Sequence, residues 1–418
     1  MKNKGITLIA LVVTIIVLLV LAGISISMLT GQNGILNRAS EAKEKTGTAN
    51  VEEQRKLAQA EALMNLEDTT YQGVTISKGF APTKIAGEDS VDKGLVITDG
   101  YGNEYVWIEV PKTEAVYKNA GINVTSFTDD EYATIEEDLH TYTNVYRNGT
   151  SFKDTWYDAS KDTNEKNLSD WYQSESDYNT AKKKMLKSVY QNGGFWVGRY
   201  EAGIEINRTV SGTATTIPLS KENLYPYTYV TRTQAKKLAE QVESGSYTSS
   251  LMFGVQWDLV LRYIEEKTVE ATKENKDKVR TQIEETLNND STTIGNYYKA
   301  GRKLVRGQYA SIADLTKWKK YNENMDNNVN NGTLVTGDSV LPTLITTGGS
   351  DETKLQNIYD IAGNMFEWTL EKTSNGSSPC AYRGGYCGNG GSYNPASFRT
   401  NVGTSYSGSG IGFRLSLY

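Results

Sequence analysis

The chain has 418 residues, a formal net charge of −6 and a single histidine, and 38% of its residues are hydrophobic. This length can bury a sizeable core in one large or two modest domains. The mildly acidic balance, without a basic stripe, gives no reason to expect nucleic acid as a partner, and one histidine excludes multi-histidine zinc sites. We expect that histidine, His140, to lie in an exposed polar loop.

An uncharged run rich in Leu, Val and Ile covers residues 6–29 and follows Lys2 and Lys4. As a helix, this run is long enough to cross a bilayer. The positive-inside rule then keeps the N-terminus in the cytoplasm and places the rest of the chain outside the cell. A cleaved signal peptide is the alternative, but the run is longer than the usual apolar core of such a peptide. We therefore predict a single-pass transmembrane helix at 6–29 and localisation in the cell membrane.

The segment Lys4-Gly5-Ile6, together with the apolar run after it, resembles the N-terminus of a type IV prepilin. The resemblance implies a leader at 1–5, cleavage between Gly5 and Ile6, and methylation of the new first residue. It also implies other pilin-like subunits as partners. Pilins usually have Glu at the fifth mature position, where this chain has Ala10. Because that Glu helps to register subunits, assembly into a filament is left open.

Residues 30–68 have a helical composition and a narrow apolar stripe, which suits a helical stalk better than a core helix. Residues 69–94 form a polar junction with Gly and Pro. From Leu95, two apolar runs on either side of Asp99-Gly100 predict a hairpin that ends near Pro111. We place the start of a globular domain here and extend it from 95 to 418.

Three helices are predicted inside this domain. A polar, loop-like stretch from residue 112 leads into the first, which Ser176 caps and Gly193 stops. The second begins at the capping box Thr231-Arg-Thr-Gln234, and the third covers 256–267. The charged stretch 268–289 is typical of a solvated helical insertion. Residues 322–349, rich in Asn, Gly and Thr, are predicted to form a loop.

After Lys372 the chain contains no Lys, Asp or Glu, and its remaining charges are Arg383, Arg399 and Arg414. Apolar residues recur there at intervals that short strands can span, which favours a folded end over a disordered one. The other residues are mostly Tyr, Ser, Gly and Asn, which binding loops use for rigid contact area and adaptable hydrogen bonds. We expect the three arginines to pair with acidic side chains, such as Glu367 and Glu371, or with backbone carbonyls.

Three motifs of this end resemble the formylglycine-generating (sulfatase-modifying factor) family: Asp360-Ile-Ala-Gly-Asn-Met-Phe-Glu-Trp368, Arg383-Gly-Gly385 and Gly412-Phe-Arg414. The family has a C-type-lectin-like fold. The resemblance therefore implies an α+β fold class, in which the transmembrane and stalk helix is followed by a lectin-like domain with irregular loops at 95–418.

In active members of that family, a pair of thiols follows the Arg-Gly-Gly motif and binds copper. Asn389 and Asn394 stand at the matching positions here, so we expect no copper and no catalysis. The cysteines that the segment does contain, Cys380 and Cys387, are either a disulfide of an exported domain or two separate thiols. A residual formylglycine-generating oxidase that acts on exported proteins is kept as an alternative function.

The resemblance also implies a structural calcium ion. Its ligands would be the carboxylates of Asp360 and Glu367 and the backbone carbonyls of Gly363 and Met365. Oxygen ligands of mixed type suit a hard cation. The alternative is that Asp360 caps a turn and that Glu367 pairs with an arginine.

A lectin-like scaffold with a Gly/Ser/Tyr/Asn face resembles the variable proteins that diversity-generating retroelements diversify. The resemblance implies a variable ligand-binding region at 383–418, with variable loops at 386–394 and 400–409. The predicted ligand-binding residues are Tyr386, Cys387, Asn389, Tyr393, Asn394, Asn401, Thr404, Ser405, Tyr406, Ser407 and Ser409. The chain is thus predicted to be a membrane-anchored, pilin-like surface protein that binds an extracellular or cell-surface ligand as a receptor or adhesin. A structural minor pilin is a further alternative.

Overall fold

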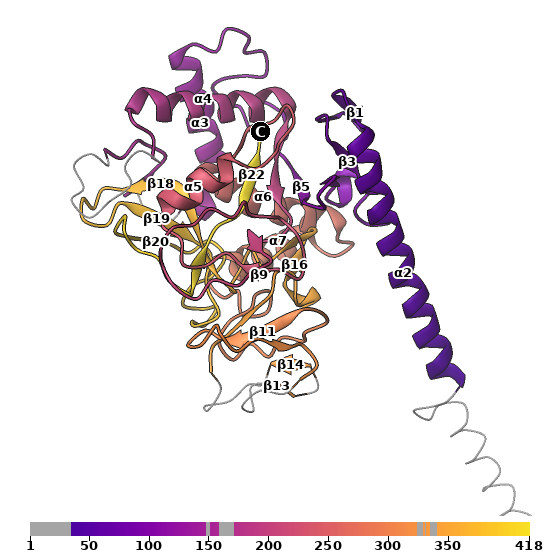
Figure 1. The fold of residues 1–418 in the computed structure, drawn as a ribbon. Coiled ribbons are helices and arrows are strands. Elements are labelled where there is room, and N and C mark those ends of the chain that lie inside the picture. The colour runs from indigo at the N-terminus through magenta and orange to yellow at the C-terminus, as the bar shows by residue number, and fades with distance from the viewer. Residues whose placement is uncertain (1–34, 148–150, 159–170, 324–328, 331, 335–340) are drawn as a thin grey trace, which may run out of the picture. The chain divides into compact units, whose positions relative to one another are not determined.

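The computed structural model describes residues 35–147, 151–158, 171–323, 329–330, 332–334 and 341–418. The chain divides into two compact units, residues 1–57 and 58–418. Helix α2 (Ile35–Met64) begins in the first unit, within the predicted stalk (Figure 1). Among the described residues, no helix is both long enough and apolar enough to cross a membrane. The predicted leader and transmembrane helix, residues 1–29, lie outside the described residues.

A six-stranded antiparallel sheet lies at the centre of the second unit. In spatial order its strands are β10 (Ser249–Leu251), β22 (Leu415–Leu417), β7 (Gly194–Gly198), β5 (Glu104–Glu109), β4 (Val96–Asp99) and β3 (Phe80–Pro82). Strands β4 and β5 form the predicted hairpin, in which Val96 faces Val106. The Asp99 carboxylate accepts the amides of Tyr101 and Asn103 at 2.9 Å each, which holds the turn.

Strand β3 belongs to the stretch 69–94, for which the sequence predicts a junction. It pairs with β4 and is an edge strand of the six-stranded sheet. The physical reason is Phe80, whose buried ring packs against Tyr105 at a centroid distance of 5.9 Å. Two further strands of this stretch, β1 (Thr69–Tyr71) and β2 (Val74–Ile76), form a separate hairpin. The folded domain therefore includes residues before Leu95.

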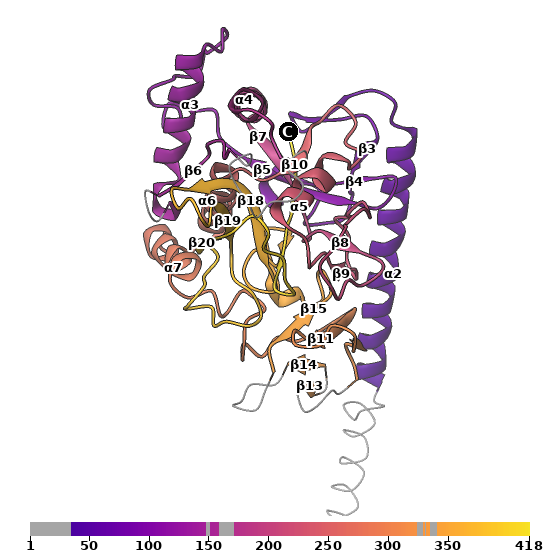
Figure 2. The same cartoon turned by 60° about the vertical axis from the view of Figure 1, so that its left-hand side comes forward.

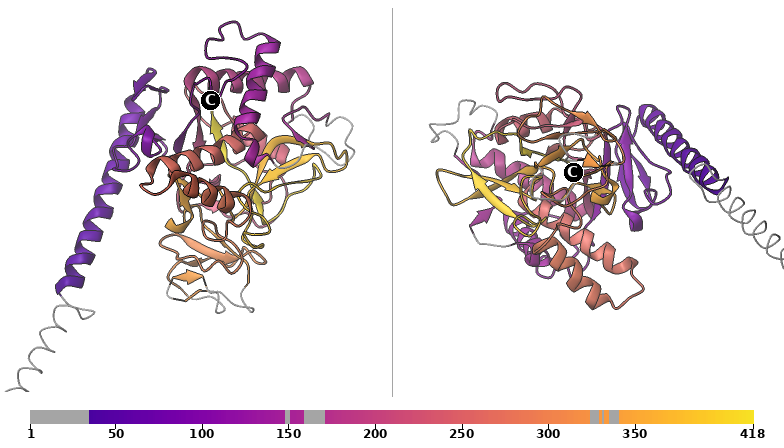
Figure 3. Two further views of the ribbon diagram at one scale, coloured as in Figure 1. Left: turned by 180° about the vertical axis from the view of Figure 1, so that it is seen from behind. Right: turned by 90° about the horizontal axis from the view of Figure 1, so that it is seen from below.

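The described helices of the second unit differ from the predicted ones at several ends. They are α3 (Asp129–Tyr142), α4 (Glu175–Asn192), α5 (Arg232–Glu240), α6 (Gly254–Ala271) and α7 (Lys276–Asn288). Ser174 caps α4, in place of the predicted Ser176, and a left-handed Gly193 ends it. Helix α5 starts at the predicted capping box. Helices α6 and α7, salmon in Figure 3, lie side by side and cover the charged stretch 268–289.

Helix α3 falls in the stretch that the sequence predicts to be loop-like. It carries a readable signal, because Thr128 and Glu131 form a complete capping box. His140 therefore lies in the last turn of a helix, with its side chain only 21% exposed, and the prediction of an exposed loop is wrong. Packing of α3 against α4 and α6 causes this burial.

A second sheet carries the C-terminal motifs. Its strands are β18 (Phe366–Thr373), β19 (Cys380–Arg383), β20 (Arg399–Val402), β21 (Ile411–Gly412) and β6 (Phe152–Lys153). The central strand, β18, is antiparallel to β19 and parallel to β21. Figure 2 shows β18, β19 and β20 side by side. The C-terminal segment is thus folded, as its recurring apolar residues predict.

Short strands and turns complete the second unit. The remaining pairs are β8 (Gly203–Ile204) with β9 (Tyr225–Pro226), β13 (Val329–Asn330) with β14 (Thr333–Leu334), and β16 (Lys354–Leu355) with β17 (Ile358–Tyr359). A three-stranded sheet consists of β12 (Lys319–Lys320), β11 (Gln308–Ser311) and β15 (Thr343–Ile345). The 3-10 helices are η1 (Val91–Lys93), η2 (Asn144–Tyr146) and η5 (Asp351–Thr353). The stretch 322–349, predicted to be a loop, therefore includes short strands.

One hydrophobic cluster joins both large sheets to helix α6. It contains Trp196 of β7, Trp257 of α6 and Trp368 of β18, each at most 1% exposed. The indoles of Trp257 and Trp368 donate to the carbonyls of Ala396 and Val230 at 3.1 and 3.0 Å, so their polar edges are satisfied inside the core. The fold class is α+β with irregular loops.

Candidate functional site

The arginines of the C-terminal segment are buried and paired, as the sequence predicts. Arg383 approaches Asp258 of α6 at 2.7 Å and Glu371 of β18 at 3.5 Å. Arg399 lies 3.0 Å from Asp258 and 3.1 Å from Glu371. Burial alone would raise the pKa of Asp258, but Arg383, Arg399 and Arg147 hold it below its ordinary value. This arginine network fixes β18, β19 and β20 against α6.

The third arginine, Arg414, joins three strands. Its guanidinium lies 2.7 Å from the Glu367 carboxylate of β18. It also donates to the carbonyls of Gly198 and Tyr359, at 3.0 and 2.8 Å. Because all of these groups are buried, Arg414 has a structural role and is not available to an external ligand.

Three of the predicted calcium ligands, Asp360, Gly363 and Met365, lie in the tight loop before β18, and the fourth, Glu367, lies on β18. Asp360 and Gly363 have left-handed backbones, with φ of 56° and 75°. Glu367 is engaged by Arg414, which agrees with the alternative that it pairs with an arginine. The Oδ2 atom of Asp360 accepts the amide of Gly348 at 3.2 Å, and the Oδ1 atom is buried. Burial raises the pKa of Asp360, and the side chain of Thr353 beside this carboxyl opposes the rise.

A third carboxylate, Glu201, lies beside this loop and was not found from the sequence. It accepts the side-chain amide of Asn364 at 2.6 Å and the backbone amide of Met365 at 3.1 Å. Burial raises the pKa of Glu201, and the nearby charges of Asp360 and Glu367 raise it further. Glu201, Asp360 and Glu367 are all buried, and Arg414 forms an ion pair with Glu367. The buried carboxylate oxygens next to Asp360 are ligands that suit a hard cation.

We predict that calcium raises the melting temperature of the full chain, because an ion that binds only the folded state stabilises it. At a concentration one hundred times Kd the gain would be about 2.7 kcal/mol. Asp360→Ala should abolish the rise. Asp314→Ala is the control, because Asp314 pairs with Lys317 at the surface and should leave the response intact. A wild-type melting curve that calcium does not change would exclude the site.

Glu136, His140 and Asp154 form another group whose ligand atoms lie within 4.8 Å of one another. Lys182 already supplies positive charge there, at 2.7 Å from Glu136 and 2.9 Å from the carbonyl of Asp154. The Asp154 carboxylate accepts the first amides of α6 at 2.7 and 2.9 Å. Burial lowers the pKa of His140 to about 4, so it is neutral at pH 7. We assign this group a structural role.

A pocket of about 620 Å³ opens over the C-terminal segment. Its wall consists of Tyr229, Ile312, Phe366, Tyr382, Tyr386, Asn389, Asn394, Phe398, Thr400, Tyr406, Gly408, Ser409, Gly410 and Ile411. Six of these residues are aromatic, and none has an acidic or basic side chain. The pocket thus combines ring surfaces with amide and hydroxyl groups, which is the usual composition of a small-molecule site.

The structure brings five of the predicted ligand-binding residues into this pocket. They are Tyr386, Asn389, Asn394, Tyr406 and Ser409. Thr400 lies in the predicted loop 400–409, whereas the sequence did not predict the contributions of Tyr229, Ile312, Phe366, Tyr382 and Phe398. Phe366 and Tyr382 lie on β18 and β19, where strand alternation could have indicated one exposed face. Nothing local in the sequence places Tyr229 there.

The other predicted ligand-binding residues lie elsewhere. Cys387 and Thr404 are buried, at 0% and 4% exposure, so the prediction that they contact a ligand is corrected. Asn401 donates to the carbonyl of Ser378 at 2.7 Å, and the hydroxyl of Ser407 bonds to that of Ser211 at the same distance. Tyr393 and Ser405 are exposed but are not part of the pocket wall.

Asn389 and Asn394, the positions that correspond to the thiol pair of the resembled family, lie side by side in the pocket. The side-chain amide of Asn389 donates to the side-chain oxygen of Asn394. The cysteines do not replace these thiols. Cys380 and Cys387 are buried thiols of two different clusters and form no disulfide with each other. Burial raises the pKa of Cys387, which opposes formation of a reactive thiolate.

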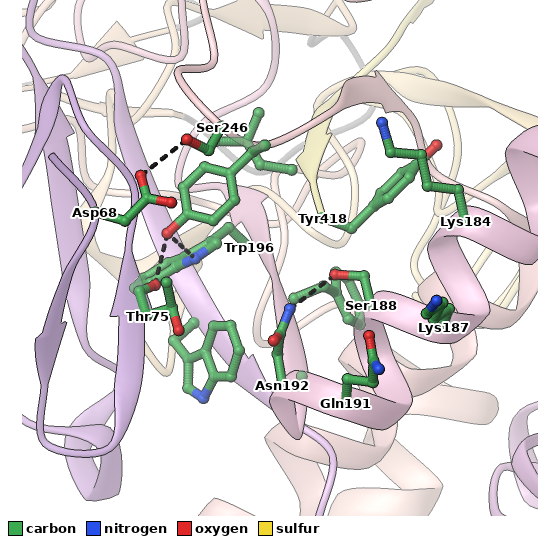
Figure 4. Close-up of a pocket in the computed structure, with 15 residues that line it drawn as sticks. Asp68, Thr75, Lys184, Lys187, Ser188, Gln191, Asn192, Trp196, Ser246 and Tyr418 are labelled. Carbon is green, nitrogen blue, oxygen red and sulfur yellow. Dashed lines mark hydrogen bonds between the residues drawn. The ribbon is translucent and has the colours of Figure 1, made fainter. Parts of the chain in front are cut away.

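A smaller cavity, of about 300 Å³, lies between α4 and the end of the six-stranded sheet. Figure 4 shows Lys184 and Lys187 on one side of it and Asp68 on the other. Several of its polar groups bond to one another. The Trp196 indole donates to the Tyr247 hydroxyl at 3.1 Å, and this hydroxyl donates to the carbonyl of Thr75 at 2.7 Å. A third pocket, of about 650 Å³, is lined by the structural group Glu136, His140 and Asp154. We place the candidate site in the C-terminal pocket, which contains predicted ligand-binding residues.

The fold is an α+β domain whose C-terminal pocket has an aromatic wall without charged side chains. No family model matches the chain, and no curated protein matches it. Its structure is similar, at 13% identity and a TM-score of 0.30, to that of CarF, over 53% of this chain and 85% of CarF. PvdO from Pseudomonas aeruginosa is similar at 11% identity and a TM-score of 0.26, over 54% of this chain and 81% of PvdO. Treponema denticola variable protein 1 is similar at 12% identity and a TM-score of 0.20, over 84% and 98% of the two chains.

Proposed function

We propose that this chain is a non-catalytic binding protein whose ligand occupies the C-terminal pocket. The observation that supports this function is the pocket wall, in which six aromatic rings converge with amide and hydroxyl groups around about 620 Å³. Pockets of roughly 300–1,000 Å³ with this mixture enclose small ligands or parts of larger ones. The proposal includes no copper and no oxidation chemistry, because amides stand at Asn389 and Asn394.

We further propose that the pocket is the diversified surface of the protein. Seven of its residues come from the loops 386–394 and 400–409. The residues between these loops are held by the buried arginine network, and loops tolerate change when their scaffold is rigid. Adenine-directed mutagenesis of Asn codons with a pyrimidine third base yields mainly Asn, Tyr, Ser, Gly, Asp, Cys and Thr. The segment Tyr386-Cys-Gly-Asn-Gly-Gly391 uses only residues of this set.

Sequencing of sibling gene copies tests this proposal. We expect substitutions to concentrate at the variable positions of the pocket wall: Tyr386, Asn389, Asn394, Tyr406 and Ser409. Buried Arg383 and Arg414 should stay constant, since each satisfies a buried acid. Changes spread evenly over residues 100–418, or purine third bases in the Gly, Ser and Thr codons of the loops 386–394 and 400–409, would contradict the proposal.

We also propose that the domain is displayed outside the cell by a membrane-anchored, pilin-like N-terminus. The uncharged run at 6–29 and the segment Lys4-Gly5-Ile6 support this localisation. We predict cleavage between Gly5 and Ile6, with methylation of Ile6 and retention of the product in the membrane. Mass spectrometry of the mature N-terminus measures this directly. A mature start between residues 23 and 30 would show a signal peptide instead.

A further inference from the structure

We propose that the ligand of the C-terminal pocket is an uncharged saccharide. This inference rests on the proposed binding function and specifies the chemistry of its ligand. It follows from the charge of the wall, from the arrangement of its rings, and from the position of its polar groups.

The pocket wall has no charged side chain that could pair with a charged group of a ligand. None of its residues is acidic or basic. Arg383 and Arg399 of the segment are bound to Asp258 and Glu371 inside the protein, and Arg208 donates to the backbone carbonyl of the wall residue Tyr229 at 3.2 Å. Burying an unpaired charge costs several kcal/mol, on the order of the whole binding energy of a small ligand. Ligands recognised through a phosphate, a carboxylate or an ammonium group therefore do not suit this pocket.

The aromatic rings of the wall form an apolar surface, and their planes are tilted relative to one another. Phe366 lies at its centre, 4.8 Å from Tyr382 and 4.8 Å from Tyr386 between ring centroids, and 6.0 Å from Phe398. All four side chains are partly exposed. Such a surface binds a flat apolar face, which both an aromatic ring and the C–H face of a sugar ring provide.

The polar groups of the pocket wall indicate which of these two, an aromatic ring or a sugar ring, suits the pocket better. Asn389, Asn394, Thr400 and Ser409 belong to the same wall as the rings, and the side-chain amide of Asn389 donates to that of Asn394. An aromatic side chain of a protein partner would cover these groups and pair with few of them, and each buried unpaired group costs about 1–3 kcal/mol. A sugar ring has hydroxyls around its edge, which both donate and accept. A neutral saccharide therefore matches the rings and the polar groups together.

The test uses the purified full chain and immobilised neutral oligosaccharides, each paired with a version of the same backbone that carries a uronic or sialic acid. We expect at least one neutral member to bind at least tenfold more tightly than its acidic counterpart. Tyr386→Ala should weaken this binding at least tenfold, and Tyr386→Phe should weaken it less. Tyr101→Ala is the matched control, because Tyr101 is 70% exposed on the turn between β4 and β5 and lies outside the pocket wall. Melting curves of each variant show whether it is folded.

Two outcomes would contradict the proposal that the ligand is an uncharged saccharide. One is that no neutral member binds, or that the acidic members bind better. The other is binding to target cells that resists excess free sugar but is lost in Ile206→Asp. Ile206 is 83% exposed on the loop that Arg208 ties to the carbonyl of Tyr229 at 3.2 Å, so that result would show a protein partner and leave the proposed function standing. If neither Tyr386→Ala nor Tyr406→Ala alters binding to sugars or cells, the proposed function itself fails.

Discussion

Replacement of Arg383 by alanine is expected to lower the free energy of unfolding by about 3–5 kcal/mol. The guanidinium is fully buried, at 2.7 Å from Asp258 and 3.5 Å from Glu371, and it also donates to the carbonyls of Phe398 and Ser397. Its removal leaves two buried acids with less compensating charge. This uncompensated burial, more than the loss of one attraction, accounts for the large effect.

Urea unfolding measures the difference. Arg383→Lys should fall between the wild type and the alanine variant, because lysine keeps the charge but cannot reproduce the guanidinium fork. Lys84→Ala is the control, because its pair with Glu61 at 2.9 Å is exposed and should contribute only about 0–1 kcal/mol. A loss below about 1 kcal/mol for Arg383→Ala would show that the arginine network does not hold the C-terminal strands.

Gly363→Ala is expected to destabilise the fold by about 2–5 kcal/mol, from the combined costs of a left-handed alanine and of overpacking. The backbone has φ of 75° there, which L residues with a Cβ rarely adopt. A Cβ at this position would also lie 2.4 Å from the carbonyl oxygen of Asn296. Because the obstacle is backbone, it cannot move aside as a side chain would.

The matched control for this variant is Gly376→Ala. A Cβ at Gly376 would meet no atom within 4 Å, and the backbone there has no left-handed φ, so alanine should change stability little. Thermal unfolding of both variants provides the comparison. Equal melting temperatures for the two variants would mean that the loop at Asp360–Glu367 rearranges freely, and the cation site would then lose its structural basis.

The fold was predictable where its signals are local. The hairpin at 95–111 follows from two apolar runs around an Asx turn, and α5 follows from a capping box whose two bonds are both present. Helix α3 shows the limit of this reasoning. Its capping box, Thr128 and Glu131, is an equally local signal. The helix is mostly polar, however, so its composition does not indicate the buried face that Ile135 and Leu139 form.

The candidate site was predictable only in part. Composition indicates a binding segment, and five of the individually predicted ligand-binding residues line the pocket. Composition cannot separate Tyr386, which faces the pocket, from its neighbour Cys387, which is buried. Which side chain points inward depends on how the loop packs against residues such as Leu344 and Met365, and these come from other segments.

By itself the sequence determined that the last part of this chain carries few charges, that its arginines need acidic or carbonyl partners, and that its loops have the composition of a binding surface. Only the tertiary structure determined which side chains pair with one another inside the protein. Asp258, which binds Arg383, lies 125 residues away along the chain, and Glu201 lies 163 residues from the Asn364 amide that it accepts. Ion pairs and pockets depend on distances between groups, and distances between remote segments are fixed only when the core packs.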